Sequence, residues 1–273
     1  MRLINQRPGP RARFLLGAVP FAVLAGVYAV ASHLRLADNP ADKILPSLDA
    51  MVSAFIRMAF VPDPRSGDFL LWTDTAASLM RLGAGIAVST LAALTLGIAI
   101  GFVPRARATV APFVAAISLI PPITVLPILF IALGLGEAAK IMLIVVGTAP
   151  VMIRSVAQAV MEIPEEQIIK AETLGASTWQ MILRVVLPQI WPRLFTIIRL
   201  ALVPAWIFLI SAEAIASTGG LGYRIFLVRR YLAMDVILPY VAWITLIAYV
   251  LDRVLLVASK RLFAWAHLKG DAL

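Results

Sequence analysis

The chain has 273 residues, of which 61% are hydrophobic and 14% are charged, whereas an average soluble domain has about 25% charged residues. Such a composition is typical of a protein with several membrane spans. The absence of cysteine excludes disulfides, thiolate metal sites and a cysteine nucleophile, and two histidines argue against a His-rich metal site or a Ser-His-Asp triad. In a membrane protein, a formal net charge of +9 indicates which segments face the cytoplasm rather than nucleic-acid binding.

Six apolar segments are candidates for membrane spans. Three of them contain no charged residue and are long enough to cross a hydrocarbon core of about 30 Å: residues 14–34, 82–104 and 108–136. Three are shorter, have charged residues just beyond their ends, and span when extended by about one turn: residues 141–153, 200–212 and 236–251. We therefore expect an all-α polytopic membrane protein with one transmembrane domain, residues 14–265, between terminal tails 1–13 and 266–273.

The segment between the first two spans, residues 35–74, has more acidic than basic residues and is expected outside the membrane. Within it, residues 44–60 carry apolar side chains at helical spacing, with Ser47 as the N-cap. Residues 69–80 are expected to form an interfacial helix that leads into the second span.

Basic residues predict the sides of the other segments. Four arginines and no acidic residue precede the first span, which places the N-terminus in the cytoplasm. Six crossings return the C-terminus to the cytoplasm, and further basic residues agree with that side: Arg105, Arg107, Lys260, Arg261 and Lys269. Three arginines fall on the outer side, against the bias, where they would attract a small anion, bind a partner protein, or pair with Glu213 and Asp235: Arg224, Arg229 and Arg230.

The cytoplasmic segment 163–187 is polar and charged, between apolar spans. Pro164, Glu165 and Glu166 make a favourable helix start, Gly175 ends that helix, and Ser177 caps a second one, residues 178–186. One interpretation is an ordinary helix-turn-helix loop on the membrane surface. The other is an elbow that a partner protein grips, and a short rigid helix would transmit the partner's motion.

Four motifs in order resemble those of ATP-binding-cassette (ABC) importer permeases of the nitrate, taurine, sulfonate and bicarbonate group. The spacing from Gly175 to Leu187-Pro188 is that of their coupling loop, whose Glu-Ala-Ala start is only partly kept here, as Ile169, Lys170 and Ala171. The other three motifs are Ile44-Leu-Pro-Ser47, the segment from Pro121-Pro122 to Glu137, and Glu213 followed by Gly219-Gly-Leu-Gly-Tyr223.

The resemblance implies a type I importer permease with a cytoplasmic coupling helix between spans four and five. The chain would be a multi-pass protein of the bacterial inner membrane and a transport subunit, not an enzyme. It has no phosphate-binding loop of the Gly-x-x-x-x-Gly-Lys-Ser/Thr kind, so ATP hydrolysis would come from a separate chain. ATP and Mg²⁺ would be bound by two copies of a separate ATPase, no cofactor by this chain. A second permease copy would complete the translocation pathway, and an extracytoplasmic binding protein would deliver a small solute. The expected solute is a small anion such as nitrate, a sulfonate or taurine, or bicarbonate. The implied coupling residues are Glu165, Glu166, Ala171, Glu172, Leu174, Gly175, Ala176, Leu187 and Pro188.

A second set of residues forms the candidate pathway or gate: Pro121, Pro122, Glu213, Gly219, Gly220, Gly222 and Arg224. Each has a structural alternative, namely a packing kink at the prolines, a flexible turn at the glycines, and a Glu213–Arg224 ion pair. Gly97 and Gly101 allow close helix approach, within the chain or at a dimer seam. Arg154 is expected to reach the headgroups rather than substrate.

Two other classes of function remain as alternatives. An ATP-independent secondary transporter or channel would usually show more spans, inverted repeats or ionisable residues at mid-membrane. An intramembrane enzyme would need catalytic groupings inside the spans, and none stands out.

Overall fold

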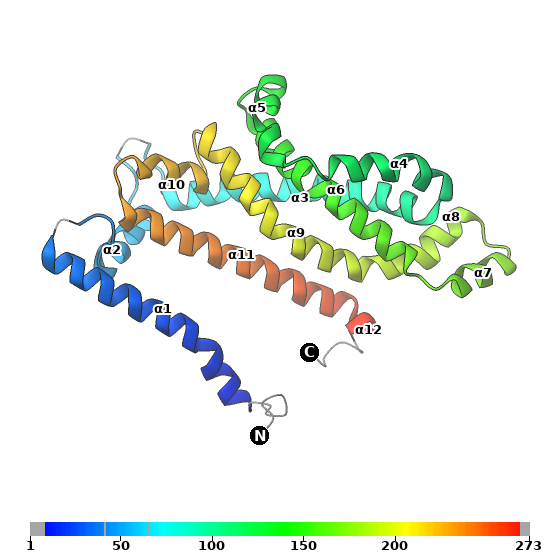
Figure 1. Ribbon diagram of the computed structural model, residues 1–273, viewed down its shortest axis with the longest axis horizontal. Helices are drawn as coiled ribbons and strands as arrows, with labels where there is room; N and C mark the ends of the chain where they lie inside the picture. The colour runs from blue at the N-terminus through cyan, green and yellow to red at the C-terminus, as the bar shows by residue number, and fades with distance from the viewer. Residues whose placement is uncertain (1–8, 41, 65, 268–273) are drawn as a thin grey trace. The chain divides into compact units, whose positions relative to one another are not determined.

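The computed structural model describes residues 9–40, 42–64 and 66–267, and they are helical with short connections (Figure 1). Part of the basic N-terminal tail and Lys269 lie outside these residues. Contacts divide the chain into two compact units, one of residues 1–70 and 228–242 and the other of residues 71–227 and 243–273. Helix α11, Met234–Leu262, belongs to both units.

The first unit contains α1, Pro10–Asp38, and α2, Leu48–Phe60. The expected N-cap is confirmed, because the Ser47 hydroxyl accepts a hydrogen bond from the Ala50 N–H. The preceding segment folds back on α1: Tyr28 Oη donates to the Pro46 carbonyl at 2.7 Å and Ser32 Oγ to that of Leu45 at 3.0 Å. The Ile44 N–H and the Arg35 guanidinium hold the pKa of Asp42 below its usual value.

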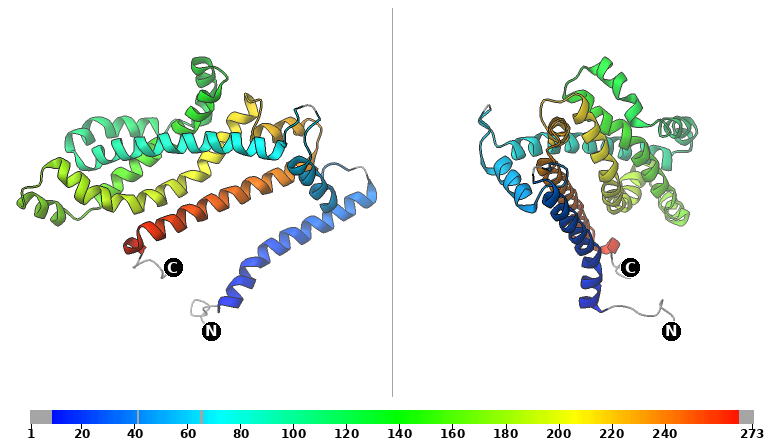
Figure 2. Two further views of the ribbon diagram at one scale, coloured as in Figure 1. Left: turned by 180° about the vertical axis from the view of Figure 1, so that it is seen from behind. Right: turned by 60° about the vertical axis from the view of Figure 1, so that its left-hand side comes forward.

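The second unit holds the remaining helices: α3, Leu70–Phe102; α4, Pro104–Ile117; α5, Pro122–Leu133; α6, Glu137–Met161; α7, Glu165–Thr173; α8, Thr178–Met181; α9, Leu187–Ile215; α10, Leu221–Arg229; and α12, Ala264–His267. Its core is apolar and is built mainly from α3, α6 and α9. Figures 1 and 2 show α7 and α8 at one end of α6 and α9, and the start of α10 at the other end. The unit thus has two ends with different structures.

Within the described part of the chain, five helices are long and apolar enough to cross a membrane, and the bent pair α4–α5 brings the number to as many as six. The expected continuous span over 108–136 is wrong in detail, since α4 and α5 meet at 95°. Pro121 and Pro122 lack backbone N–H groups, so the helix cannot continue through them, and Pro122 instead starts α5. The short spans extend as predicted into α6, α9 and α11.

Helix α3 runs without interruption over 33 residues. The helix expected over 69–80 to lead into the second span is present from Leu70 and forms the first part of α3, without a break before the span. Nothing between Leu70 and Phe102 breaks a helix, because the chain has no proline there and Gly83 and Gly85 cost only about 1 kcal/mol each.

Small residues let α3 and α6 approach closely. A Cβ atom on Gly97 would lie 2.7 Å from Val156 Cβ, and one on Gly101 would lie 2.5 Å from Val160 Cβ and 2.8 Å from the Ala157 carbonyl oxygen. The Gly97–Gly101 pattern is thus filled by contacts within the chain, which excludes it as a dimer seam.

Large apolar side chains remain exposed on the second unit, including Phe113, Ile131 and Val203 at 65%, 87% and 68% of their surface. In water such a surface would favour aggregation, whereas lipid or a second apolar surface accommodates it. The described helices therefore agree with the predicted all-α membrane protein.

We expect Gly101→Ala to destabilise the protein by about 1–3 kcal/mol, since the new methyl group overpacks the α3–α6 contact. Gly83→Ala is the matched control on the same helix, because a Cβ there meets nothing within 4 Å. Thermal unfolding of both variants in one detergent measures the difference. Equal unfolding temperatures for Gly101→Ala and the wild type would contradict the packing.

Candidate functional site

The predicted cytoplasmic segment forms two short helices, α7 and α8, joined by a sharp turn. We call residues 165–181 the elbow. Helix α7 starts after Pro164 with Glu165 and Glu166 in its first turn, where acidic side chains favour the helix dipole. It ends at Gly175, whose φ of +78° lies in the left-handed region that favours glycine. The Gly175 N–H donates to the Glu172 carbonyl at 2.9 Å and the Ala176 N–H to that of Ala171 at 3.0 Å, which closes the helix end.

The second half of the elbow is fixed by a capping box. The Ser177 hydroxyl accepts from the Gln180 N–H, and the Gln180 side chain accepts from the Ser177 N–H. Helical structure then continues for 38 residues, from Thr178 to Ile215. Pro188 removes one backbone donor, and the turn Ile182–Val186 before it is π-helical.

The elbow presents its side chains to the outside. None of the α7 residues is buried, and Leu174 and Trp179, on either side of the Gly175 turn, expose 81% and 66% of their surface. A hydrogen bond of 2.9 Å from Gln189 Nε2 to Gln167 Oε1 ties α7 to the start of α9. The elbow is thus a small rigid body with an apolar tip, a form suited to a protein partner.

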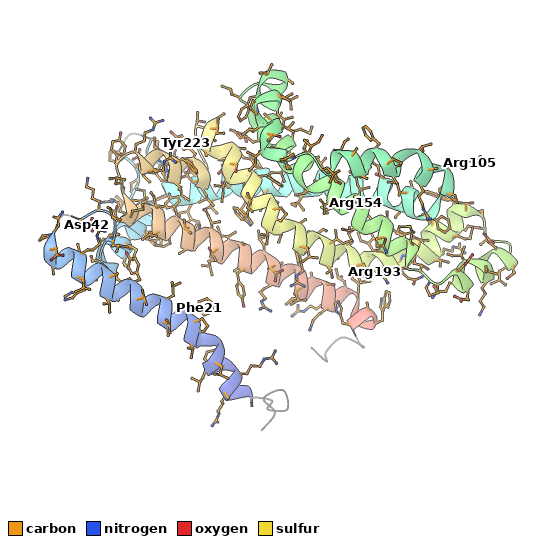
Figure 3. The ribbon with its side chains drawn as sticks, in the orientation of Figure 1. Phe21, Asp42, Arg105, Arg154, Arg193 and Tyr223 are labelled. Atoms are coloured by element: carbon orange, nitrogen blue, oxygen red, sulfur yellow. The ribbon has the colours of Figure 1, made fainter. Side chains whose placement is uncertain are left out.

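The Arg105–Arg107 turn lies at the same end of the unit as the elbow. Arg107 and Glu165 line one small pocket, and Figure 3 labels Arg105 at that end and Tyr223 at the other. The prediction that this turn and the elbow share one side of the membrane therefore agrees with the fold.

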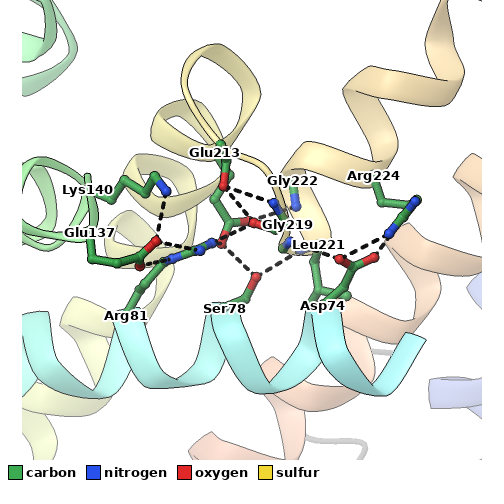
Figure 4. A network of polar contacts seen from close by, with 12 residues as sticks. Asp74, Ser78, Arg81, Glu137, Lys140, Glu213, Gly219, Leu221, Gly222 and Arg224 are labelled. Atoms are coloured by element: carbon green, nitrogen blue, oxygen red, sulfur yellow. Dashed lines mark hydrogen bonds and ion pairs between the residues drawn. The ribbon is translucent and has the colours of Figure 1, made fainter. Parts of the chain in front are cut away.

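At the opposite end, a polar network is buried between α3, α6, α9 and the turn before α10 (Figure 4). Arg81 lies at its centre, with Nη1 2.6 Å from Oε1 of the fully buried Glu213 and Nε 2.5 Å from Oε2 of Glu137. Lys140 also contacts Glu137, at 2.9 Å, and Arg224 Nε lies 2.8 Å from Asp74 Oδ2. Three acidic and three basic side chains balance each other.

The same network binds the backbone of the turn after α9. The N–H groups of Gly220, Leu221 and Gly222 donate in order to Asp74 Oδ1, Ser78 Oγ and Glu213 Oε2, at 2.9, 2.9 and 2.8 Å. Arg81 Nη1 donates to the Gly219 carbonyl at 2.8 Å. Gly220 has a φ of +125°, and a Cβ atom there would lie 2.5 Å from Glu213 Oε1. Glycine is required at that point, and the turn is held rather than flexible.

The structure brings five of the predicted pathway or gate residues together, namely Glu213, Gly219, Gly220, Gly222 and Arg224. The predicted Glu213–Arg224 pair is wrong: Arg81 is the cation at Glu213, and Arg224 pairs with Asp74. Asp252 likewise pairs with Arg199, at 2.7 Å, while the Arg253 guanidinium lies over the Tyr249 ring.

Sequence reasoning missed the members of the network on α3 and α6. Asp74, Ser78 and Arg81 are spaced four and three residues apart, so they share one helix face. That spacing could have indicated a polar helix face. It was overlooked because these residues were assigned to the outer segment and to an interfacial helix.

Pro121 and Pro122 lie apart from this network, at the α4–α5 bend. Pro122 lines an apolar cavity of about 400 Å³ between α4, α6 and α9, together with Ser118, Gly147, Thr148 and Phe208. A polar groove of about 640 Å³ adjoins the cavity and shares three residues with it: Val151, Ser155 and Ile197. The groove's own polar lining is Arg154, Gln158, Glu162, Arg193 and Thr196.

Within the described ranges, no three His, Asp or Glu side chains are placed to hold a metal ion. The unit has three notable features instead: the exposed elbow, the ion-pair network around Arg81 at the opposite end, and the groove along α6 and α9. Apolar spans with these features define a multi-pass membrane transport subunit.

Comparison with known proteins gives the family. Residues 90–264 match the family described as binding-protein-dependent transport system inner membrane component, and the chain belongs to it. It is 36% identical over 199 residues to the taurine transport system permease protein TauC of Escherichia coli K12, covering 72% of each chain. It is 28% identical over 215 residues to the nitrate import permease protein NrtB of Leptolyngbya laminosa, covering 78% of this chain and 74% of that one. The predicted class, an ABC transporter permease subunit, is confirmed.

A solved structure shares the fold. An inward-facing structure of the MetNI methionine ABC transporter aligns with a TM-score of 0.54 at 23% identity, over 67% of this chain and 92% of that chain. The identity is too low to carry function, so this match supports the architecture alone.

We expect Arg81→Gln to destabilise the protein by about 3–5 kcal/mol, because it leaves the buried Glu213 without its cation. Adding Glu213→Gln should recover part of that loss, with a coupling of about 0.5–3 kcal/mol in a double-mutant cycle. Thermal unfolding in detergent measures both.

The control for this cycle is Arg193→Gln, whose pair with Glu162 is about half exposed, with 44% and 52% of the two side chains accessible. Arg193→Gln should lower the free energy of unfolding by less than about 1 kcal/mol. Additive effects of Arg81→Gln and Glu213→Gln would show that the two side chains do not stabilise each other.

Proposed function

We propose that two copies of this chain form the translocation pathway of an ABC importer for a small anion. An extracytoplasmic binding protein delivers the solute, and two copies of a separate ATPase drive transport through the elbow. The observation that carries the proposal is the elbow itself, a capped turn with the exposed side chains of Leu174 and Trp179 at its tip. An ATPase subunit could bury these two apolar side chains in a pocket of its surface, and aromatic side chains often dominate such contacts.

Helix continuity supports this use of the elbow. The residue that caps α8 is Ser177, and the helical run that follows reaches Ile215, two residues beyond Glu213 in the buried network. A displacement of the elbow is therefore passed along one helix rather than absorbed by a loop. An ATP-independent transporter has no need of such a lever.

The solute class is inferred from relatives and chemistry. The printed functions of the relatives above concern taurine and nitrate, which share a small oxyanion group, and a sulfonate, nitrate or bicarbonate is accordingly the solute proposed here. Exposed apolar side chains on the second unit suit a contact with the second permease copy.

Gly175→Val should weaken ATPase association by about tenfold or more, because a β-branched residue at φ +78° costs roughly 1–2 kcal/mol. Gly134→Val is the matched control, since Gly134 has a φ of +76°, open space around it and a place at the end of α5. Copurification of the ATPase with each variant, and solute-stimulated ATP hydrolysis, are the measurements. Normal association of Gly175→Val would remove the elbow from the interface, and a chain that transports with no ATPase bound would remove the proposed function.

The orientation is tested with single cysteines, which the cysteine-free chain accepts cleanly. In intact cells, a membrane-impermeant thiol reagent should label Ser66→Cys, in the segment proposed to lie outside. Lys170→Cys, exposed on α7, should react only after permeabilisation. The reverse pattern would invert the proposed topology.

A further inference from the structure

Among the residues that the structure describes, one basic residue on α3, α6 and α9 has no acidic partner. Eight charged residues lie on α3, α6 and α9: Asp74, Arg81, Glu137, Lys140, Arg154, Arg193, Arg199 and Glu213. Seven of them form ion pairs with opposite charges. Arg154 instead donates from Nη1 to the Ser118 hydroxyl at 2.9 Å, and no carboxylate of the described residues pairs with it.

Arg154 lies on the wall of the groove between α6 and α9. Residues 151, 154, 155 and 158 form one face of α6, at helical spacing, and residues 193, 196 and 197 form the facing strip of α9. Figure 3 labels Arg154 and Arg193 on these two helices. Arg193 pairs with Glu162 at 2.6 Å, so that pair is neutral and the groove keeps the single positive charge of Arg154.

The chemistry of the lining fits a small oxyanion. A guanidinium has five N–H donors in a planar fork that matches two oxygens of one anion, and the one hydrogen bond to Ser118 leaves donors free. The Thr196 hydroxyl lines the same groove, whereas the Ser155 hydroxyl, also on its wall, donates to the Val151 carbonyl at 2.9 Å. The adjoining apolar cavity has room for the rest of a small solute. A cation in an apolar helix that has no carboxylate partner and faces a polar groove is a typical member of a substrate path in membrane transporters.

We propose that Arg154 is a substrate-contacting residue of the translocation pathway and that it receives the oxyanion group of the solute. This inference rests on the proposed function and assigns the anion contact to the α6–α9 groove, not to the arginines near α10. The contact exchanges readily, because the groove is open and offers a single net charge.

The test uses the complete transporter, with its ATPase and binding protein, in proteoliposomes. Uptake of labelled taurine, nitrate and bicarbonate is measured beside solute-stimulated ATP hydrolysis for Arg154→Gln and Arg154→Lys. We expect Arg154→Gln to lower uptake per ATP hydrolysed at least tenfold, with ATP hydrolysis within twofold of wild type, and Arg154→Lys to recover part of the uptake. Arg253→Gln on α11 is the matched control and should transport as wild type, since Arg253 contacts Tyr249 and does not line the groove.

The outcomes separate this inference from the function on which it rests. Normal anion uptake by Arg154→Gln overturns the inference and leaves the proposed function intact. Wild type that transports only other, cationic or uncharged solutes and none of the three labelled ones overturns the inference together with the proposed anionic solute class, and leaves only the ATP-driven importer standing. Equal loss of uptake, ATP hydrolysis and assembly assigns Arg154 a structural role and also overturns it. An effect of Arg154→Gln that disappears when anionic lipid is omitted from the vesicles would assign the arginine to a lipid phosphate. Wild type that takes up no solute with the ATPase present sinks the proposed function itself.

A second measurement does not depend on transport. Ser155→Cys places a thiol in the groove next to Arg154, and its rates of reaction with anionic and cationic methanethiosulfonates report the local potential. The ratio of anionic to cationic rate should fall at least threefold when Arg154→Gln is added and stay unchanged with Arg253→Gln. A ratio that does not change with Arg154 would show that this charge does not act on the groove.

Discussion

The ion pair between Arg81 and Glu213 determines the arrangement of the second unit at the end away from the elbow. Both side chains are buried, and an unpaired charge at either position would be costly. Arg81 therefore has to be met by Glu213 from α9 and Glu137 from α6, which fixes the three helices relative to one another. The remaining acceptor of Glu213 holds the Gly222 N–H, so the turn after α9 is positioned by the same pair. The tight Gly97 and Gly101 contacts secure α3 against α6 further along.

This network also sets a mechanical condition on transport. Helix α9 carries Glu213 near one end and is continuous with the capped elbow at its start. A helix that moves as a rigid body cannot shift the elbow without either carrying the network along or breaking it. Breaking it would leave three acidic and three basic side chains without partners, and moving as a unit preserves every contact. Joint movement of α3, α6 and α9 would therefore keep these contacts, whereas sliding of α9 alone would break them.

Local features could be predicted from the sequence because their causes are local. Ser47 and Ser177 cap helices since their hydroxyls reach the next free N–H groups, and Gly175 ends α7 because it tolerates positive φ. The class of protein followed from low charge and from motif order. The partner of Glu213 did not, because Arg81 is 132 residues away and Arg224 is only 11 residues away along the chain. Helix packing, rather than proximity in sequence, selects among acidic and basic residues.

The same physics changes the interpretation of positive charge in this chain. Of the three arginines near α10 that could attract an anion, bind a partner protein or pair with acidic residues, Arg224 pairs with Asp74 at 2.8 Å. The first two uses stay predictions that concern Arg229 and Arg230. Arg81 is buried and has two carboxylates, whereas Arg154 is exposed along a groove and has a hydroxyl. A buried guanidinium requires fixed counter-charges, since water cannot solvate it. A guanidinium that faces an open groove stays charged without fixed counter-charges, and its N–H donors remain available. Burial, and not the count of basic residues, therefore distinguishes an arginine that holds the fold, such as Arg81, from an exposed arginine whose donors stay available, such as Arg154.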